Sequence, residues 1–242
     1  MFVKPKGLRY YDFLVALHAS FDLDWYLEIG CRTGSSLVHS RAKTIAVDPQ
    51  FLIESNVIVA KPALLAFQQP SDDFFKSDFL RNAGIKLSFS FLDGMHLFEF
   101  LLRDFMNTEA NGTSESVICL HDCVPFDHEM TTRDLDNIPR KAWTGDVWKL
   151  LPILKEFRPE LKVTVLDSRP TGMVMVSGLD PKNTVLKENY NAILKRFTQM
   201  DLASYGVERF FSEFRMSSTS AYLADGYPDF APHMRRALTA AE

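Results

Sequence analysis

The fold is decided by the stretch Leu27-Glu28-Ile29-Gly30-Cys31-Arg32-Thr33-Gly34-Ser35-Ser36. Its apolar first half predicts a strand that ends at Gly30, followed by a tight turn and a helix that opens near Ser35. Glycine at positions 30 and 34 permits an otherwise strained turn and a close approach of the backbone to a ligand. The free amides at the start of a helix then favour a carboxylate, a phosphate or a hydroxyl-rich group.

The next predicted strand ends at Asp48, whose carboxylate could bind both hydroxyls of a ribose. A dinucleotide fingerprint, G-x-G-x-x-G, would place glycine where this chain has Arg32, and that bulky side chain occupies the space a pyrophosphate would need. The pattern therefore favours a nucleoside ligand without a pyrophosphate. A glycine-rich turn that binds no ligand is the alternative interpretation.

Around this stretch, short apolar runs alternate with longer amphipathic ones. The runs that predict strands are WYLEIG, TIAVDP, NVIVAKP, LSFSFLDG, VICLHDC, KVTVLDS and GMVMVSG. Helices are predicted between them, over 35–42, 71–83, 95–107 and 145–157, with a kink or a late start at Pro152. The last two strands are too close in sequence for a crossover and should form an antiparallel hairpin. The sequence thus predicts an α/β fold: a Rossmann-like, doubly wound, mostly parallel sheet with helices on both faces.

The chain divides into three parts by pattern. Residues 1–23 predict an N-terminal helical segment, 24–179 the α/β domain, and 180–242 a helical C-terminal extension. The extension could be a lid, an oligomerisation element or a set of packed helices, with packing as the default interpretation.

At this point the sequence resembles a known group of enzymes. The pattern E-I-G-x-x-x-G, the acidic end of the second strand and the closing hairpin are similar to class I S-adenosylmethionine-dependent methyltransferases, over roughly residues 24–178. The motifs LDGMH, HDCVP and WTGDVW resemble the "methyltransferase 24" family of small-molecule and sugar O-methyltransferases. The resemblance implies S-adenosylmethionine as cofactor and, in some relatives, a divalent metal, Mg²⁺ or Mn²⁺.

The resemblance also implies roles for residues of the first three strand ends. Glu28, Gly30 and Gly34 would shape the pocket for the methionine end of the cofactor, together with Cys31 and Ser35 of the same turn. Asp48 would hold the ribose. The adenine would lie near Ser71, Asp72 and Asp73, although a helix N-cap explains Ser71 or Asp72 equally well.

Two further carboxylates end the fourth and fifth predicted strands, Asp93 and Asp122. The carboxyl ends of parallel strands face one crevice, so these groups should lie beside the cofactor. Two neighbouring carboxylates repel each other unless a cation or a proton intervenes. We therefore expect Asp93, His121 and Asp122 to form a divalent metal site, with Asp93 also counted among the cofactor contacts.

The nature of this site stays open in three respects. His121 stands where metal-dependent relatives usually have Asp, and imidazole suits Mn²⁺, Fe²⁺ or Zn²⁺ better than Mg²⁺. Asp93 could instead cap the following helix and Asp122 could bind loop amides. His96, His121 and Asp122 are the candidate catalytic residues, and His121 is the expected base if no metal is bound. A zinc site of Cys119, His121 and Cys123 is discounted, because residues two apart along a strand span too far.

Composition and charge exclude several classes of protein. The chain has 242 residues, 46% hydrophobic and 24% charged, with a net charge of −4, so neither nucleic acid nor a membrane surface is an expected partner. Three cysteines and no signal-peptide pattern favour a reduced, cytoplasmic protein. Phe occurs 20 times, which fits a filled core and a homo-oligomer interface.

Three hypotheses about function follow. The first is a methyltransferase acting on a hydroxyl of a small molecule or glycan. The second is a non-catalytic cofactor-binding or assembly protein on the same fold. The third, an NAD-dependent enzyme, is disfavoured by Arg32 and the closing hairpin. The acceptor itself cannot be deduced from the sequence, since acceptor specificity resides in loops.

Overall fold

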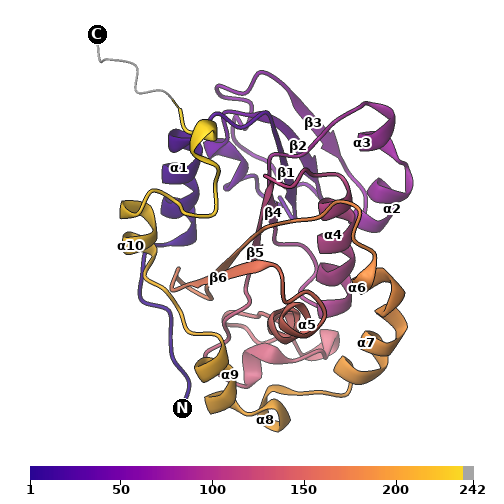
Figure 1. Cartoon of the computed structure of the whole chain (residues 1–242), viewed down its shortest axis with the longest axis vertical. Helices are drawn as coiled ribbons and strands as arrows, with labels where there is room; N and C mark the ends of the chain where they lie inside the picture. The colour runs from indigo at the N-terminus through magenta and orange to yellow at the C-terminus, as the bar shows by residue number, and fades with distance from the viewer. Residues whose placement is uncertain (237–242) are drawn as a thin grey trace.

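The computed structural model describes residues 1–236 and is built on a seven-stranded sheet of order β3-β2-β1-β4-β5-β7-β6 (Figure 1). The strands are β1 (Trp25–Ile29), β2 (Lys43–Val47), β3 (Leu64–Phe67), β4 (Phe89–Leu92), β5 (Val117–His121), β6 (Lys162–Leu166) and β7 (Met173–Ser177). Only β7 runs antiparallel to its neighbours, β5 and β6. The predicted mostly parallel sheet with a C-terminal hairpin is confirmed.

The order of the strands reverses at the centre of the sheet. The chain proceeds from β1 outward to β2 and β3, then returns to β4 on the other side of β1 and continues to β5. At such a reversal the connections leave in opposite directions and open a crevice beyond the carboxyl ends of the strands. Strands β4 and β5 are buried along their whole length, as expected for the middle of a sheet covered on both faces.

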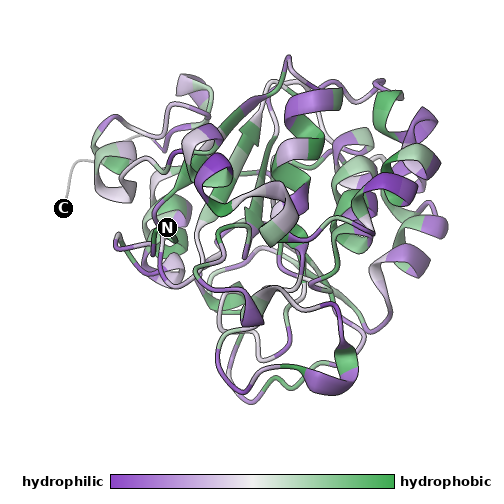
Figure 2. Cartoon of the chain, turned by 90° about the horizontal axis from the view of Figure 1, so that it is seen from below, coloured by the Kyte–Doolittle hydropathy of each residue, from purple (hydrophilic) through white to green (hydrophobic). Residues whose placement is uncertain are grey.

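Two hydrophobic cores lie on the two faces of the sheet. One face is covered mainly by α4 (Phe98–Ala110), α5 (Leu150–Phe157) and α7 (Tyr190–Phe197), and the other by α1 (Tyr10–Ser20) and α10 (Thr219–Ala224), as Figure 1 shows. The green apolar residues in Figure 2 accordingly lie along the strands and on the inner sides of the helices. The remaining helices are α2 (Ser71–Lys76), α3 (Phe79–Asn82), α6 (Val185–Glu188), α8 (Leu202–Tyr205) and α9 (Val207–Glu213).

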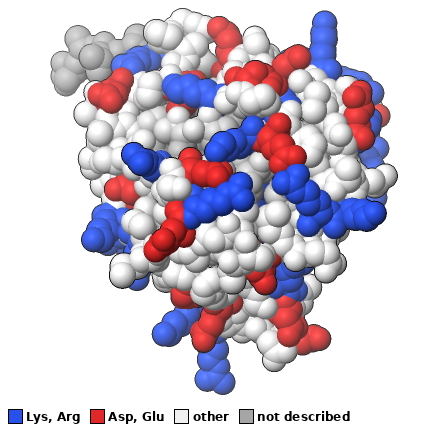
Figure 3. Space-filling view, turned by 60° about the horizontal axis from the view of Figure 1, so that its bottom comes forward, with Lys and Arg blue, Asp and Glu red and all other residues white. Residues whose placement is uncertain are grey.

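Short 3-10 turns complete the structure: η1 (Leu37–His39), η2 (Glu129–Thr131), η3 (Leu135–Asn137), η4 (Val147–Lys149) and η5 (Pro232–Met234). In residues 1–236 we find no helix with both the length and the apolar character that crossing a bilayer requires. Acidic and basic side chains are interspersed over the face shown in Figure 3.

The third strand differs from its prediction. The apolar run at 56–62 forms a turn, and β3 begins two residues later, at Leu64. The side chain of Asn56 accepts hydrogen bonds from the amides of Ile58 and Val59, so it stabilises a turn that competes with strand pairing. Val59 adopts a left-handed φ of 42°, and it and Ile58 are exposed to solvent.

The helix predicted at 35–42 is also wrong: only the single turn η1 forms there. Helix α1 packs over this turn and covers the face of the sheet that a longer helix would have covered. The predicted helix at 71–83 is interrupted at Asp78, which has a left-handed φ of 51°. By contrast, the predicted late start at Pro152 is confirmed, because α5 begins at Leu150 and places the proline in its first turn.

The C-terminal segment passes from one face of the sheet to the other. Ile193 and Phe197 belong to the core beneath α4 and α5, whereas Tyr222 and Phe230 belong to the core beneath α1. Buried Asp229 fixes the second part, since it accepts hydrogen bonds from Ser177 Oγ at 2.7 Å and from the Tyr222 hydroxyl at 2.8 Å. Residues 180–236 thus contribute to both cores, and the last part of the predicted extension, 237–242, lies outside the described residues.

Candidate functional site

A pocket of about 810 Å³ opens at the carboxyl ends of β1, β2, β4 and β5. Most of the residues predicted from the sequence line it: Gly30, Cys31, Ser35, Asp48, Ser71, Asp93, His96, His121 and Asp122. Glu28, Gly34 and Asp72 do not line it. The crevice predicted from the strand order therefore exists, and the strand-end carboxylates meet in it.

Gly30 brings the ends of two central strands together. It has a φ of 87°, and a Cβ atom at this position would lie 1.9 Å from the carbonyl oxygen of Asp93. Any side chain would therefore push β1 and β4 apart. Gly34 closes the same turn with a φ of 77°, but it packs on Val57 and does not face the pocket.

Asp48 is held rigidly at the end of β2. Its Oδ2 accepts a hydrogen bond from the Arg32 amide at 2.8 Å, and its Oδ1 accepts one from the Gln50 amide at 2.7 Å. Each carboxylate oxygen keeps a second lone pair, so Asp48 retains the capacity to accept hydrogen bonds from two ligand hydroxyls. Two backbone contacts thus orient a carboxylate that still faces the pocket.

Glu28 lies beneath the pocket rather than in it. Its side chain is fully buried and accepts hydrogen bonds from the Tyr26 hydroxyl, at 2.6 Å, and from the Ser36 hydroxyl. Burial raises the pKa of Glu28 to about 7, although both hydrogen bonds oppose the shift. Its role is to fix the turn after β1 from below, because Ser36 belongs to that turn.

Glu28→Gln is expected to flatten the pH dependence of stability. Because burial raises the pKa from 4.5 to about 7, the folded protein holds this proton more tightly than the unfolded chain does. The free energy of unfolding therefore falls between about pH 4.5 and pH 7, by on the order of 3 kcal/mol from this group. Urea unfolding of the native and Glu28→Gln proteins at about pH 5 and about pH 8 measures the effect. If the free energy of unfolding fell equally between the two pH values in both proteins, the raised pKa of Glu28 would be contradicted.

Asp72 has a structural partner outside the pocket. Its two oxygens accept hydrogen bonds from Nε and Nη2 of Arg103, at 2.8 Å each. Arg103 also donates a hydrogen bond to the Tyr190 hydroxyl at 2.7 Å. The Arg103 hydrogen bonds hold the pKa of Asp72 below its usual value. Of the three residues predicted near an adenine, Ser71 is the one that lines the pocket.

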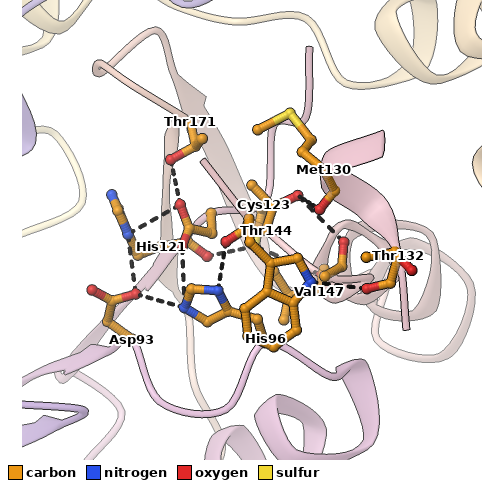
Figure 4. A network of polar contacts seen from close by, with 12 residues as sticks. Asp93, His96, His121, Cys123, Met130, Thr132, Thr144, Val147 and Thr171 are labelled. Carbon is orange, nitrogen blue, oxygen red and sulfur yellow. Dashed lines mark hydrogen bonds and ion pairs between the residues drawn. The ribbon is translucent and has the colours of Figure 1, made fainter. Parts of the chain in front are cut away.

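At the ends of β4 and β5 the pocket is lined by a cluster of two carboxylates and two histidines (Figure 4). His121 Nδ1 lies 3.1 Å from Asp93 Oδ1 and 3.4 Å from Asp122 Oδ1. His96 Nε2 lies 3.2 Å from Asp122 Oδ2 and 3.6 Å from Asp93 Oδ1. Figure 4 shows both histidine rings directed at Asp93 from different sides.

The contact made by His96 Nδ1 determines what His96 Nε2 can bind. Nδ1 lies 2.7 Å from the carbonyl oxygen of Trp143, which can only accept, so Nδ1 carries a proton. In a neutral ring, Nε2 would then present a lone pair to the Asp122 oxygen. That contact is favourable only if a cation, either a proton or a metal ion, lies at Nε2. Burial alone would lower the pKa of His96, but the contacts with Asp93 and Asp122 raise it to about 9.

His121 is placed differently. Its Nε2 is buried without a hydrogen-bond partner among the described residues, and its ring packs against Tyr10 at 4.3 Å and Phe91 at 5.8 Å between centroids. Within residues 1–236, the group of ligand atoms close enough to share one metal ion is Asp93, His96 and Asp122, all within 4.8 Å of one another. Both histidines therefore contact the two carboxylates, and the distances between ligand atoms single out His96 as the third member of a metal-binding group.

Asp122 reaches this cluster through an unusual backbone. It has a left-handed φ of 61°, and the hydroxyl of Thr171, from the loop of the β6–β7 hairpin, donates to its Oδ1. The hairpin was predicted, but its contact with the site was not. No local sequence signal could have revealed it, because the two residues meet only through the pairing of β5 with β7.

Aromatic side chains from outside the central strands wall the pocket. Tyr10 and Tyr11 of α1 line it, and the amide of Tyr10 donates a hydrogen bond to the carbonyl of Arg169 at 3.0 Å. Trp143 lies over His96, with 5.0 Å between ring centroids, and its indole donates to the carbonyl of Thr132 at 2.9 Å. The tyrosines are functional candidates that the sequence analysis missed.

The loop that carries Trp143 is fixed by a partly buried ionic cluster. Arg133 contacts Asp146 Oδ2 at 2.5 Å and Glu99 Oε1 at 2.7 Å, and Lys149 contacts the same Asp146 oxygen at 2.6 Å. Gly145 beside it has a φ of 52°, and a Cβ there would lie 1.6 Å from the carbonyl oxygen of His96. These contacts hold Trp143 and His96 in one arrangement.

Comparison with solved structures shows which known proteins share this fold. No family model matches the sequence, and no curated protein matches it. Among solved structures, the cofactor-bound protein Rv0187 from MTB has a TM-score of 0.51 at 15% identity, over 70% of this chain and 79% of that one. The O-methyltransferase TomG from Streptomyces achromogenes, in complex with SAM, has a TM-score of 0.50 at 13% identity, over 71% and 78%. The chain has the Rossmann-like fold of these proteins. At such identities the likeness extends to the fold alone.

Proposed function

We propose that the protein is an S-adenosylmethionine-dependent methyltransferase that acts on a hydroxyl of a small molecule or glycan. One observation carries the proposal: a single pocket joins the Gly30 turn and Asp48 on one side to the Asp93–His96–Asp122 group on the other. The first half suits a nucleoside and the second suits an ionisable hydroxyl. The O-methyltransferase TomG, solved with SAM, has the same fold, so the fold is compatible with this activity.

The half of the pocket around the Gly30 turn and Asp48 would bind and orient the cofactor. When bound, S-adenosylmethionine supplies an activated methyl group, so the protein has mainly to orient it and exclude water. Asp48 would accept the ribose hydroxyls, the Gly30 turn would leave room for the thioether chain, and Ser71 would lie at the adenine end. The rigid hydrogen bonds of Asp48 preorganise this half before the ligand arrives.

The donor set of Asp93, His96 and Asp122 fits a divalent cation. Two carboxylate oxygens and an imidazole nitrogen converge, and the Trp143 carbonyl fixes the tautomer that leaves Nε2 free to coordinate. Such an ion would lower the pKa of an acceptor hydroxyl. The nitrogen ligand favours Mn²⁺ over Mg²⁺.

The same group offers a base. His96 Nε2 lies between two carboxylates, which raise the pKa of the His96 imidazolium to about 9. The neutral ring that can take a proton from an acceptor hydroxyl therefore forms as the pH rises toward that value. His121, packed under Tyr10, is better suited to orient Asp93 through Nδ1. We therefore assign the acceptor chemistry to His96 and Asp122. The cytoplasmic location, the homo-oligomeric state and the choice between small-molecule and glycan acceptors stay predictions.

Thermal unfolding with S-adenosylhomocysteine tests the proposal. Ligand at about a hundred times its Kd should stabilise the protein by roughly 2.7 kcal/mol, which raises Tm by several degrees. Mn²⁺ or Mg²⁺ should add a further shift if the Asp–His–Asp group binds metal, and NAD⁺ is the control. No shift at millimolar S-adenosylhomocysteine would overturn the proposal, whereas binding without methyl transfer would favour a non-catalytic cofactor-binding protein.

A further inference from the structure

A second cavity lies against β6, the strand that ends the sheet on one side (Figure 1). It has a volume of about 550 Å³ and is lined by residues of α5, of β6 and of the segment 213–217. It shares no lining residue with the pocket at the carboxyl ends of the strands. Its size lies in the range of pockets that bind ligands, roughly 300–1,000 Å³. We call this cavity the β6 groove.

The outer edge of β6 is paired only near its end. The Ser217 amide donates to the Val165 carbonyl at 2.8 Å, and the Asp167 amide donates to the Ser217 carbonyl at 2.9 Å. Alternate residues of a strand direct their backbone groups to the same edge, so the amide and carbonyl of Val163 and the amide of Val165 also face outward. Within residues 1–236 these three groups have no hydrogen-bond partner. A short stretch of strand edge therefore lies free beside the cavity.

Apolar side chains form the floor of the β6 groove. Leu151 of α5, Val165 of β6 and Phe214 line it and are buried in the core, and Val163 packs against the same core. In an added strand, every second side chain would be directed toward this floor. The β6 groove thus offers both backbone hydrogen bonds and apolar contacts to an extended chain.

The cations around the β6 groove differ in their availability. Arg158 is buried, and two glutamates balance its charge. Arg215 is exposed and belongs to no ion pair in the described part of the chain. Lys155 is 57% exposed and shares the Glu213 carboxylate with an arginine and a tyrosine. Arg215 and Lys155 therefore favour an acidic partner, whereas a second copy of the chain across a two-fold axis would bring the same cations together.

We propose that the β6 groove binds an extended, acidic peptide segment of a partner protein, which pairs with the free edge of β6. One peptide residue would donate its amide to the Val163 carbonyl and accept the Val165 amide, as Ser217 does one step further along the strand. The preceding peptide carbonyl would accept the Val163 amide. These backbone hydrogen bonds would supply affinity, and Arg215 would select acidic side chains. The inference does not depend on methyl transfer.

Three synthetic peptides test the proposal on the native protein. Calorimetry would measure the Kd of acetyl-Glu-Val-Glu-Val-Glu-amide, of the same peptide with Lys in place of Glu, and of the Glu peptide with N-methylated backbone amides. We expect the Glu peptide to bind with a Kd below about 1 mM and at least about tenfold more tightly than either of the others. N-methylation removes the peptide donors and leaves the side chains unchanged.

Two variants separate the contributions of charge and backbone. Arg215→Gln should weaken the Glu peptide about fivefold or more, while Arg41→Gln is the matched control and should not. Arg41 is likewise exposed, but it precedes β2, near the other edge of the sheet. Val163→Pro removes the outward amide and leaves the hydrogen bonds to β7 in place, so it should also weaken the Glu peptide, with the native Tm as the check on folding.

Two results would overturn the proposal. The first is no binding of the Glu peptide below about 1 mM, or equal affinity for all three peptides; the cations would then only protect a free edge against association. The second is a dimer, seen by sedimentation, that Val163→Pro dissociates, because the occupant of the β6 groove would then be a second copy of the chain.

Discussion

Asp122→Asn is expected to lower methyl transfer by roughly 100-fold or more, the loss typical when a charged group next to the reacting proton is neutralised. The substitution removes the charge and little else. Asparagine tolerates the left-handed backbone of residue 122, at a φ of 61°, and can still accept the Thr171 hydroxyl. The expected loss of activity therefore measures the contribution of the Asp122 negative charge, which lies 3.2 Å from His96 Nε2.

Activity with a panel of hydroxylated acceptors and radiolabelled S-adenosylmethionine measures the effect. The affinity for S-adenosylhomocysteine should not change, because Asp122 belongs to the acceptor half of the pocket. Asp73→Asn is the control: that carboxylate is exposed, pairs with Lys76 and does not line the pocket. An Asp122→Asn protein with native activity would remove Asp122 from the proposed chemistry, and a Tm shift with S-adenosylhomocysteine would still identify the cofactor site.

Arg158→Met is expected to have the largest effect on stability, about 3–5 kcal/mol. The Arg158 side chain is 1% exposed and forms two hydrogen bonds, of 2.6 and 2.9 Å, with the Glu109 carboxylate, which is 4% exposed. Methionine fills much of the same volume but leaves that carboxylate buried with the Asp180 amide as its remaining donor. The cost of an unpaired buried charge dominates the change.

Urea unfolding of three variants and the native protein tests this explanation. Adding Glu109→Gln to Arg158→Met should restore part of the loss, because it removes the unpaired charge. Arg196→Met is the matched control, since Arg196 forms an equally short pair with Glu156, 2.6 Å, but both side chains are about half exposed. We expect it to cost about 1 kcal/mol or less. Equal losses in Arg158→Met and Arg196→Met would show that burial does not set the energy of the pair.

Much of the fold could be predicted because its determinants are local. Short β-branched and aromatic runs predicted six of the seven strands, and the brief Arg169–Gly172 connection required a hairpin. The third strand was misplaced because the side chain of Asn56 stabilises a turn inside an apolar run. The prediction of a helix after Gly34 was wrong because α1, which precedes β1 in the chain, covers the sheet there.

The candidate site likewise has features that the sequence predicted and features that only the tertiary structure shows. Sequence alone brought Gly30, Asp48, Asp93 and Asp122 together, because parallel strands must end at a common edge. It could not choose between His96 and His121, since that depends on which ring nitrogen meets a carbonyl and which is buried under Tyr10. It could not show that Glu28 lies beneath the pocket, or that Thr171 and Tyr10 reach it. Strand ends follow from chain order, whereas the direction of a side chain is set by packing between segments that only the tertiary structure brings into contact.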